Sequence, residues 1–99
     1  MKRVSIDVRF RGGAVGTNLS GRITDLSGTG LFLATQKFSP LGKEVHLEFD
    51  LPTGRVEAVG EVRWIARGGV AEQGLGIRFL RLSAPSALAI DLAIERVKA

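Results

Sequence analysis

The sequence predicts an all-β fold, a small six-stranded antiparallel β-barrel with a C-terminal α-helix. Several segments alternate apolar and polar residues, which is typical of strands that bury one face. Turns that contain glycine or proline separate these segments at close intervals, as in small barrels. The last segment instead repeats its apolar residues at helical spacing, so we expect a single helix after the last strand.

The strands follow from the alternating segments in order along the chain. Six segments are predicted as strands, at residues 5–11, 19–24, 30–35, 44–51, 55–66 and 74–80. Gly12-Gly13 is predicted to end the first strand, and Gly60 within the fifth marks a bulge or a sharp bend. The later strands are expected to turn toward the core the side chains of Val45, Leu47, Phe49, Val56, Ala58, Val62, Leu75, Ile77 and Phe79. Trp64, the only tryptophan, has the parity of the inward positions, so we expect it in the core or at a barrel end rather than stacked on a ligand.

The chain from Ser83 onward is predicted to form the helix. Ser83 can cap the helix N-terminus, and Pro85 lies in the first turn, where its missing N–H costs nothing. Leu88, Ala89, Leu92 and Glu95 recur with helical spacing, and Ile94 and Val97 extend the apolar stripe that we expect to face the sheet. We therefore expect one domain over residues 1–99, with the barrel over about residues 3–82 and a helix over about residues 84–97 that covers an open edge or end.

Composition narrows the class of protein. The 99 residues suffice to close one core, and 44% hydrophobic and 24% charged residues are typical of a globular domain. No apolar run approaches the roughly 18 residues of a membrane span or forms a signal peptide, so we expect a cytoplasmic protein without membrane insertion. The sequence has no cysteine, which excludes disulfides and thiolate metal sites. A net charge of +4 favours anionic partners, or serves solubility alone.

A polar turn with D-x-S-x-x-G spacing, from Asp25 to Gly30, joins two apolar segments. Asp25 offers only hydrogen-bond acceptors, and Ser27 both donates and accepts. Gly28 and Gly30 allow unusual backbone angles and the close approach of another molecule. This arrangement suits a group with adjacent N–H donors, such as the edge of guanine. The alternative is an ordinary loop, in which the Asp25 side chain caps the backbone two residues on.

Together with the motifs that follow it, this turn resembles the signature of the PilZ domain family. Three further segments occur in the family's order, Pro40–Val45, Gly60–Ile65 and Gly74–Phe79, and the helix follows them. The resemblance covers nearly the whole chain, in the style of the short, stand-alone PilZ proteins of myxobacteria and related deltaproteobacteria. It implies a six-stranded barrel that receives the bacterial second messenger cyclic di-GMP, with no enzymatic activity, no cofactor and no metal.

The resemblance also implies which residues bind the ligand. The implied cyclic di-GMP site consists of Arg3, Asp25, Ser27, Gly30 and Gly76, and basic support would come from Lys2, Arg9 and Arg78. The turn would hold a guanine edge, and Arg3 would meet a phosphate or a guanine face, because guanidinium is planar, bidentate and always charged. Arg9, Arg11 and Arg78 would form a basic patch if their strands are neighbours; a solvated strand surface is the alternative.

One motif of the family is incomplete. The family places an R-x-x-x-R motif before the first strand; Arg3 matches its second arginine, and the first would lie before Met1. Lys2 supplies charge but neither stacking nor a bidentate contact. Loss of one charge-assisted bidentate contact would cost about 1.5–3 kcal/mol, or about one to two decades of affinity.

Two functions of different classes are therefore expected. In the first, binding of cyclic di-GMP orders the N-terminal segment and changes the surface shown to an unidentified partner protein, in a monomer or weak dimer. In the second, the chain is a degenerate PilZ domain that does not bind cyclic di-GMP and acts as a protein–protein interaction module in motility or secretion regulation. A barrel that binds nucleic acid rests on net charge alone, so no DNA or RNA partner is expected.

Catalysis and metal binding have little support in the sequence. His46 is the only histidine and falls on the wet side of its strand, so we expect an exposed side chain and not a general base. No nucleophile elbow surrounds Ser27, and the carboxylates lack the spacing of metal ligands. Gly74–Phe79 faintly resembles an RNA-recognition strand, but apolar residues occupy the positions at which bases would stack.

Overall fold

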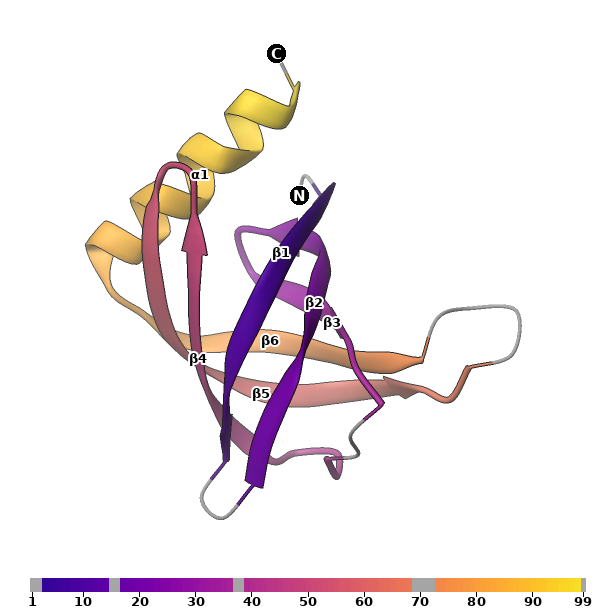
Figure 1. The fold of residues 1–99 in the computed structure, drawn as a ribbon. Coiled ribbons are helices and arrows are strands. Elements are labelled where there is room, and N and C mark those ends of the chain that lie inside the picture. The colour runs from indigo at the N-terminus through magenta and orange to yellow at the C-terminus, as the bar shows by residue number, and fades with distance from the viewer. Residues whose placement is uncertain (1–2, 15–16, 37–38, 69–72, 99) are drawn as a thin grey trace.

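The computed structural model of the chain describes residues 3–14, 17–36, 39–68 and 73–98, with side chains from residue 21 to residue 97. The described residues form six strands and one helix (Figure 1), namely β1 (Arg3–Ala14), β2 (Thr17–Ser27), β3 (Gly30–Ala34), β4 (Glu44–Leu51), β5 (Gly54–Ala66), β6 (Gly74–Leu82) and α1 (Ala84–Lys98). The strands pair antiparallel and close a barrel in the order β1-β2-β3-β6-β5-β4. The predicted six-stranded antiparallel barrel with a C-terminal helix is therefore confirmed.

The barrel core follows from the alternation of each strand. β4 is the plainest case, since its apolar residues are buried and its charged residues are exposed in strict alternation. On β6 the predicted inward residues Leu75 and Ile77 are buried as well. The irregularity predicted at Gly60 is also present, because the β5–β6 register shifts between Val59 and Gly60.

Gly12-Gly13 does not end the first strand, and that prediction is wrong. Gly12 lies opposite Leu19 of β2 on one side and opposite Leu47 of β4 on the other. A residue that pairs with both neighbours satisfies its backbone groups in the ladder. Barrel closure between β1 and β4 therefore outweighs the turn preference of the two glycines, and β1 continues to Ala14.

The polar turn between β2 and β3 is shorter than predicted. β2 continues through Asp25 to Ser27, and only Gly28 and Thr29 lie in the bend. Asp25 pairs with residues of both β1 and β3, so the backbone of the motif's first half belongs to the sheet. The motif is consequently presented on a strand end, which is more rigid than a free loop.

Buried apolar side chains and several hydrogen bonds fix α1 to the barrel. The helix buries in the core the side chains of Ala89, Ile90, Ala93 and Ile94. The backbone N–H of Ser86 donates to Ser83 Oγ at 3.3 Å, as in the predicted N-cap. Glu57 N of β5 donates to Ser86 Oγ at 2.9 Å, and Thr53 Oγ1 donates to the carbonyl of Ala89 at 2.6 Å.

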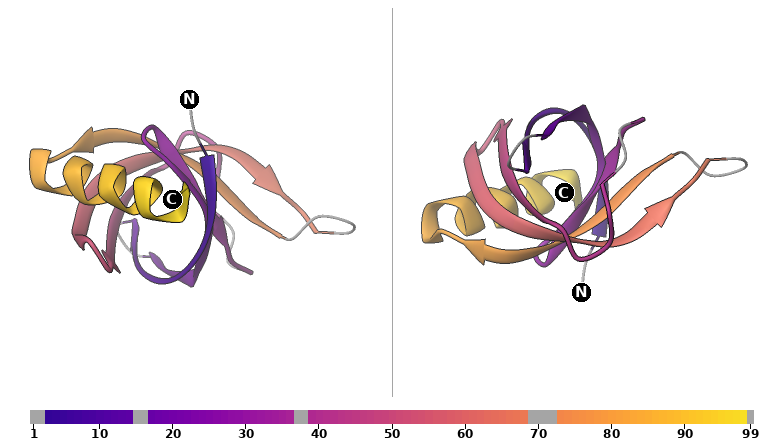
Figure 2. Two further views of the ribbon diagram at one scale, coloured as in Figure 1. Left: turned by 90° about the horizontal axis from the view of Figure 1, so that it is seen from above. Right: turned by 90° about the horizontal axis from the view of Figure 1, so that it is seen from below.

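The apolar stripe predicted for the helix is wrong at three positions. Leu88, Leu92 and Val97 are 58%, 45% and 51% exposed. The buried face is centred near Ile90, which lies almost opposite Leu88 around a helix of 3.6 residues per turn. The barrel is closed, so α1 covers no open sheet edge; it packs mainly on β5, near the β4–β5 turn (Figure 1). Figure 2 shows the other ends of β5 and β6 projecting away from α1.

Candidate functional site

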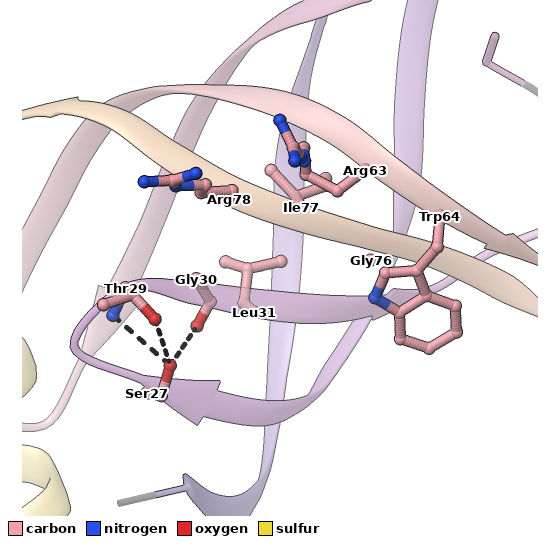
Figure 3. Close-up of a pocket in the computed structure, with 9 residues that line it drawn as sticks. All are labelled: Ser27, Thr29, Gly30, Leu31, Arg63, Trp64, Gly76, Ile77 and Arg78. Carbon is pink, nitrogen blue, oxygen red and sulfur yellow. Dashed lines mark hydrogen bonds between the residues drawn. The ribbon is translucent and has the colours of Figure 1, made fainter. Parts of the chain in front are cut away.

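The Ser27 hydroxyl organises the turn between β2 and β3 (Figure 3). Its oxygen accepts a hydrogen bond from the backbone N–H of Thr29 at 3.3 Å and donates to the carbonyl of Gly30 at 3.3 Å. Thr29 Oγ1 lies 3.3 Å from the same oxygen. The Ser27 side chain is 1% exposed, so its polar capacity is used inside the turn. The backbone-capping role considered for Asp25 is thus performed by Ser27.

The turn is held against β6 by backbone contacts. The N–H of Phe79 donates to the carbonyl of Thr29 at 2.8 Å. Gly30 lies opposite Arg78, and a Cβ at position 30 would overlap the carbonyl oxygen of Ile77. Only glycine therefore allows β3 to start this close to β6. The motif glycine is explained by backbone approach within the barrel.

A bulge in β2 places Asp25 on the outer surface of the barrel. Ile23 lies opposite Leu33 and Asp25 lies opposite Phe32, so Thr24 is an extra residue in the ladder. Ile23 is in the core, and without the bulge strict alternation would turn Asp25 inward as well. Asp25 is instead partly exposed.

The start of β1 meets the end of β2 at this motif. Arg3 lies opposite Ser27, and Ser5 lies opposite Asp25. The antiparallel register therefore brings the backbone of the predicted phosphate-binding arginine beside the predicted guanine-binding turn. The members of each pair are twenty or more positions apart in the sequence, so pairing of β1 with β2 is what makes them neighbours.

A second bulge, in β5, turns Trp64 outward, and the prediction that Trp64 packs in the core is wrong. Val62 lies opposite Ile77 and Trp64 lies opposite Gly76, so two residues of β5 oppose one of β6. Val62 is buried, whereas Arg63 and Trp64 are both exposed, with Trp64 46% exposed. Alternation counted from Val62 fails at this point because of the extra residue.

Trp64 is held on the outer surface by an aromatic stack. Its ring centroid lies 5.1 Å from that of Phe32, with 26° between the ring planes. A Cβ on Gly76 would overlap the indole, so the space above this glycine is occupied by Trp64 (Figure 3). Across the sheet, the same row contains Asp25, Phe32, Gly76 and Trp64. The close approach that Gly76 permits is that of the indole.

A surface pocket of about 290 Å³ lies between the turn and the outer side of β5 and β6. Its lining consists of Ser27, Thr29, Gly30, Leu31, Arg63, Trp64, Gly76, Ile77 and Arg78. The structure thus gathers four of the predicted site residues, Ser27, Gly30, Gly76 and Arg78, around one hollow. Asp25 does not line it and lies further along the outer surface of β2.

Arg63 was not among the predicted site residues, and Trp64 was predicted in the core or at a barrel end, although one signal of its outward position was present. Val62, Trp64 and Ile65 cannot all face inward in a regular strand, and Ile65 packs against the core. An apolar residue directly after the tryptophan is therefore a sign of a bulge between Val62 and Ile65. Arg63 itself had no signal apart from its place beside Trp64.

The pocket carries positive charge from two strands. Arg63 Nη1 lies 3.0 Å from Glu61 Oε1, and both side chains are on β5. Arg78 is exposed on β6, and among the side chains described it forms no ion pair. A guanidinium without an internal carboxylate partner is available to an anion from solution.

The other basic residues predicted to support the site are not placed beside the pocket. The neighbours of β1 are β2 and β4, so Arg9 and Arg11 are not on a strand beside Arg78 and the basic patch proposed for the three does not form. Arg9 lies opposite Arg22, away from the turn. Lys2 lies outside the described residues.

The described residues offer little for catalysis or metal binding. His46 is exposed on β4, as predicted, and β4 is a neighbour of neither β2 nor β3. Within the ranges described, no group of three or more His, Cys, Asp or Glu side chains is placed to hold a metal ion. The described part of the chain also contains no helix long and apolar enough to cross a membrane.

Comparison with known proteins gives a family match and two related folds. The profile of the PilZ domain matches residues 2–95. The Bacillus subtilis inhibitor of motility, MotI/DgrA, is similar in structure with a TM-score of 0.78 and 18% identity, over 95% of this chain and 48% of that one. This chain thus spans about half the length of the B. subtilis protein. The PilZ domain of YcgR from Escherichia coli, in a structure with c-di-GMP, gives a TM-score of 0.76 and 18% identity, over 98% of this chain and 88% of that one. A search of curated protein sequences found no match.

Proposed function

This chain belongs to the PilZ domain family, and we propose that it is a single, non-enzymatic PilZ domain that binds cyclic di-GMP and relays this signal to a partner protein. The proposed site lies where the start of β1, the β2–β3 turn and the outer side of β6 meet. The ligand would be the effector of a binding protein, and no cofactor is required.

The observation that carries this proposal is the register between β1 and β2. Arg3 lies opposite Ser27, so the backbone of a residue with a permanently charged, planar side chain runs beside the turn, and the nearby strand residue Asp25 offers only acceptors. A guanine nucleotide has both complementary parts, a phosphate for the arginine and an N–H edge for the carboxylate. The YcgR structure, which has this fold and was solved with c-di-GMP, supports the choice of ligand.

Each of these residues would have a different role in ligand binding. Asp25 would accept hydrogen bonds from the guanine edge, and Arg3 would meet a phosphate or the guanine face. Ser27 would act by keeping the turn closed, because its hydroxyl already bonds within the turn. Gly30 would let the turn lie against β6. Binding would transmit a signal only if it alters the surface that the partner meets.

Calorimetric titration of the full chain with cyclic di-GMP, with GTP as control, tests the proposal. We expect saturable binding in the micromolar range or tighter, with Asp25→Ala abolishing it while the circular dichroism spectrum is unchanged. Asp91→Ala, which removes an exposed carboxylate on α1, is the matched control and should bind as the parent does. No heat from a folded parent chain, or normal binding by Asp25→Ala, would show that the assignment is wrong.

A second candidate function is a ligand-independent interaction module. The observation that favours it is the exposed apolar pair Leu88 and Leu92 on the outer face of α1. Recovery of the same partner protein with and without cyclic di-GMP would favour this function, and recovery that depends on the nucleotide would favour the first.

A further inference from the structure

We propose that the last part of β5, from Arg63 to Ala66, is a docking edge for an extended, acidic segment of a partner protein, which adds to the sheet as a further strand. We call this part of the strand the β5 edge. The inference goes beyond the proposed function, because such a segment binds through the backbone of β5 and needs no nucleotide.

The β5 edge exists because β5 is longer than the strand beside it. β4 pairs with β5 only as far as Glu61. One residue further, the N–H of Val62 donates to the carbonyl of Lys43 at 3.0 Å, and the N–H of Gly42 donates to the carbonyl of Val62 at 2.8 Å. The N–H of Lys43 then donates to the carbonyl of Pro40 at 3.1 Å, so the chain turns away from β5. Among the described residues, the β5 edge therefore pairs on its β6 side alone.

The backbone of this edge specifies an extended partner. Trp64, Ile65 and Ala66 lie opposite consecutive residues of β6, so the edge is held as a strand before any partner arrives. Figure 2 shows this part of β5 projecting with β6 from the barrel, away from α1. A row of N–H and C=O groups on the open side of a strand is a template for another strand. A helix does not match it, because the backbone groups of a helix bond to one another.

The charge along the edge favours an acidic segment. Lys43, Arg63 and Arg67 are exposed at the two ends of the edge. Arg63 has a carboxylate partner, Glu61, at 3.0 Å. Lys43 and Arg67 form no ion pair among the side chains that the structure describes. Positive charge that is not neutralised within the chain attracts carboxylates of a partner and repels basic segments.

A second copy of this chain is a poor occupant of the edge. Antiparallel pairing of the edge with itself, centred on Ile65, sets Arg63 of each copy opposite Arg67 of the other. Like charges directly opposite each other destabilise a strand pair. The same cations therefore hinder self-association through this edge and leave it open to an acidic strand.

A hollow of about 130 Å³ at the same end of β5 gives the added strand a place for a side chain. Ile65, Ala66 and Leu75 provide the apolar part of its lining, and Arg67 lines it as well. Successive side chains of a strand point to opposite faces, so alternate residues of the partner meet the hollow. A segment that alternates small apolar and acidic residues fits both the hollow and the charge.

The test uses synthetic peptides of about six residues that alternate valine and glutamate, with both ends blocked. Added to the full chain without nucleotide, this acidic peptide should bind saturably with a dissociation constant of about 100 μM or tighter. It should also protect the backbone amides of the β5 edge from hydrogen exchange, measured by NMR. A peptide with lysine in place of glutamate should bind about tenfold more weakly.

Two further peptides test whether the partner adds as a strand. Each is N-methylated at every second residue of the acidic peptide, one at the valines and the other at the glutamates. A strand bonds to a neighbouring edge through alternate residues, so one of these peptides should keep its affinity and the other should lose it. Equal binding of the two would contradict strand addition.

The variant Arg67→Glu tests the charge preference. It should weaken binding of the acidic peptide about tenfold and strengthen binding of the lysine peptide, an exchange that a folding defect cannot produce. Arg96→Glu makes the same change at an exposed position of α1 and is the matched control, expected to bind both peptides as the parent chain does.

Three results would refute the docking edge: no binding of the acidic peptide to the folded chain, protection of amides outside the β5 edge only, or unchanged binding by Arg67→Glu. A dimer in sedimentation whose edge amides are protected without peptide would show that a second copy is the occupant, and would refute the proposal too. Calorimetry with cyclic di-GMP tests the proposed function separately, so either proposal can fail while the other stands.

Discussion

The outer surface around Arg55, over β4 and β5, and the outer surface around Arg78, over β3 and β6, surround these two arginines in opposite ways. On the first, Arg55 contacts three carboxylates, with Glu48 at 3.0 Å, Asp50 at 3.1 Å and Glu57 at 3.4 Å. On the second, Arg78 lacks such a partner among the side chains described, and it lies next to a pocket. The charge of Arg55 is neutralised by carboxylates of the same sheet, so it contributes to the sheet itself. The charge of Arg78 has no such partner among the described residues at the pocket, so it is available to a ligand. A positive net charge alone would not have distinguished these two surfaces.

The largest expected effect comes from filling the space at Gly76. Gly76→Val puts a branched side chain where the indole of Trp64 lies, so the ring must leave its position on Phe32. We expect a loss of about 1–3 kcal/mol of unfolding free energy in urea titrations, together with loss of cyclic di-GMP binding. Gly28→Ala is the control, because a Cβ at that position meets nothing within 4 Å. Equal stability of the two variants would contradict the close packing of Trp64 on β6.

The second effect distinguishes the arginines of the two surfaces by salt dependence. Arg63 and Arg78 line the pocket, so binding of the ligand's phosphates there should weaken as salt rises, because screening acts on exposed charges. The double variant Arg63→Gln/Arg78→Gln should show a shallower dependence of affinity on salt, measured by calorimetry at several sodium chloride concentrations. Arg55→Gln should keep the slope of the parent chain. A slope altered by Arg55→Gln alone would mean that the ligand contacts the β4–β5 surface.

The third effect is smaller and concerns stability. Contacts with Glu57 and then Asp50 raise the pKa of Arg55 above its ordinary value. A raised pKa contributes stability that is complete below the ordinary pKa and is lost only as pH rises through the raised one. The destabilisation caused by Arg55→Gln should therefore stay constant with respect to this arginine's own titration through neutral pH. Because the side chains are exposed, we expect a slight lowering of the melting temperature and no change in ligand affinity.

The smallest effect is expected on the outer face of α1. Leu88→Gln and Leu92→Gln remove exposed side chains, so unfolding free energy should change by no more than about 0.5 kcal/mol and nucleotide affinity should be unchanged. Ile90→Ala on the buried face is the contrast and should cost about 2–5 kcal/mol. Similar losses from the two faces, compared by thermal melts, would overturn the orientation of the helix.

The sequence was sufficient for features that depend on nearby residues. The alternation of β4 and the cap at Ser83 each depend on a few adjacent side chains, and both are found where expected. The bend at Gly28 and Thr29 lies within the predicted turn, although β2 continues three residues further than predicted. The closing ladder between β1 and β4 is different. It forms from residues more than thirty positions apart, and it carries β1 through glycines that would break an isolated strand.

The β5–β6 side of the pocket could not be predicted from the sequence, because it also depends on pairing between separate strands. Whether Trp64 faces inward depends on how β5 pairs with β6, and one unpaired residue reverses the answer. In the helix, both Leu88 and Ala89 belong to plausible apolar stripes. Packing against the barrel decides which stripe is buried, and the buried stripe is the one that contains the small side chains of Ala89 and Ala93. Packing between elements decided both cases.

The extra residue in β5 has a consequence for the length of this strand, because the ladder with β6 does not need it. In a regular stretch of strand, deletion of one residue turns every later side chain to the opposite face of the sheet. Deletion of Arg63 would merely regularise the ladder, leaving Trp64 opposite Gly76 and Ile65 against the core. The extra residue can thus be lost here without changing which later side chains of β5 face the core. Length variation at this point is a route by which a lineage could add or discard a cation while retaining the aromatic ring.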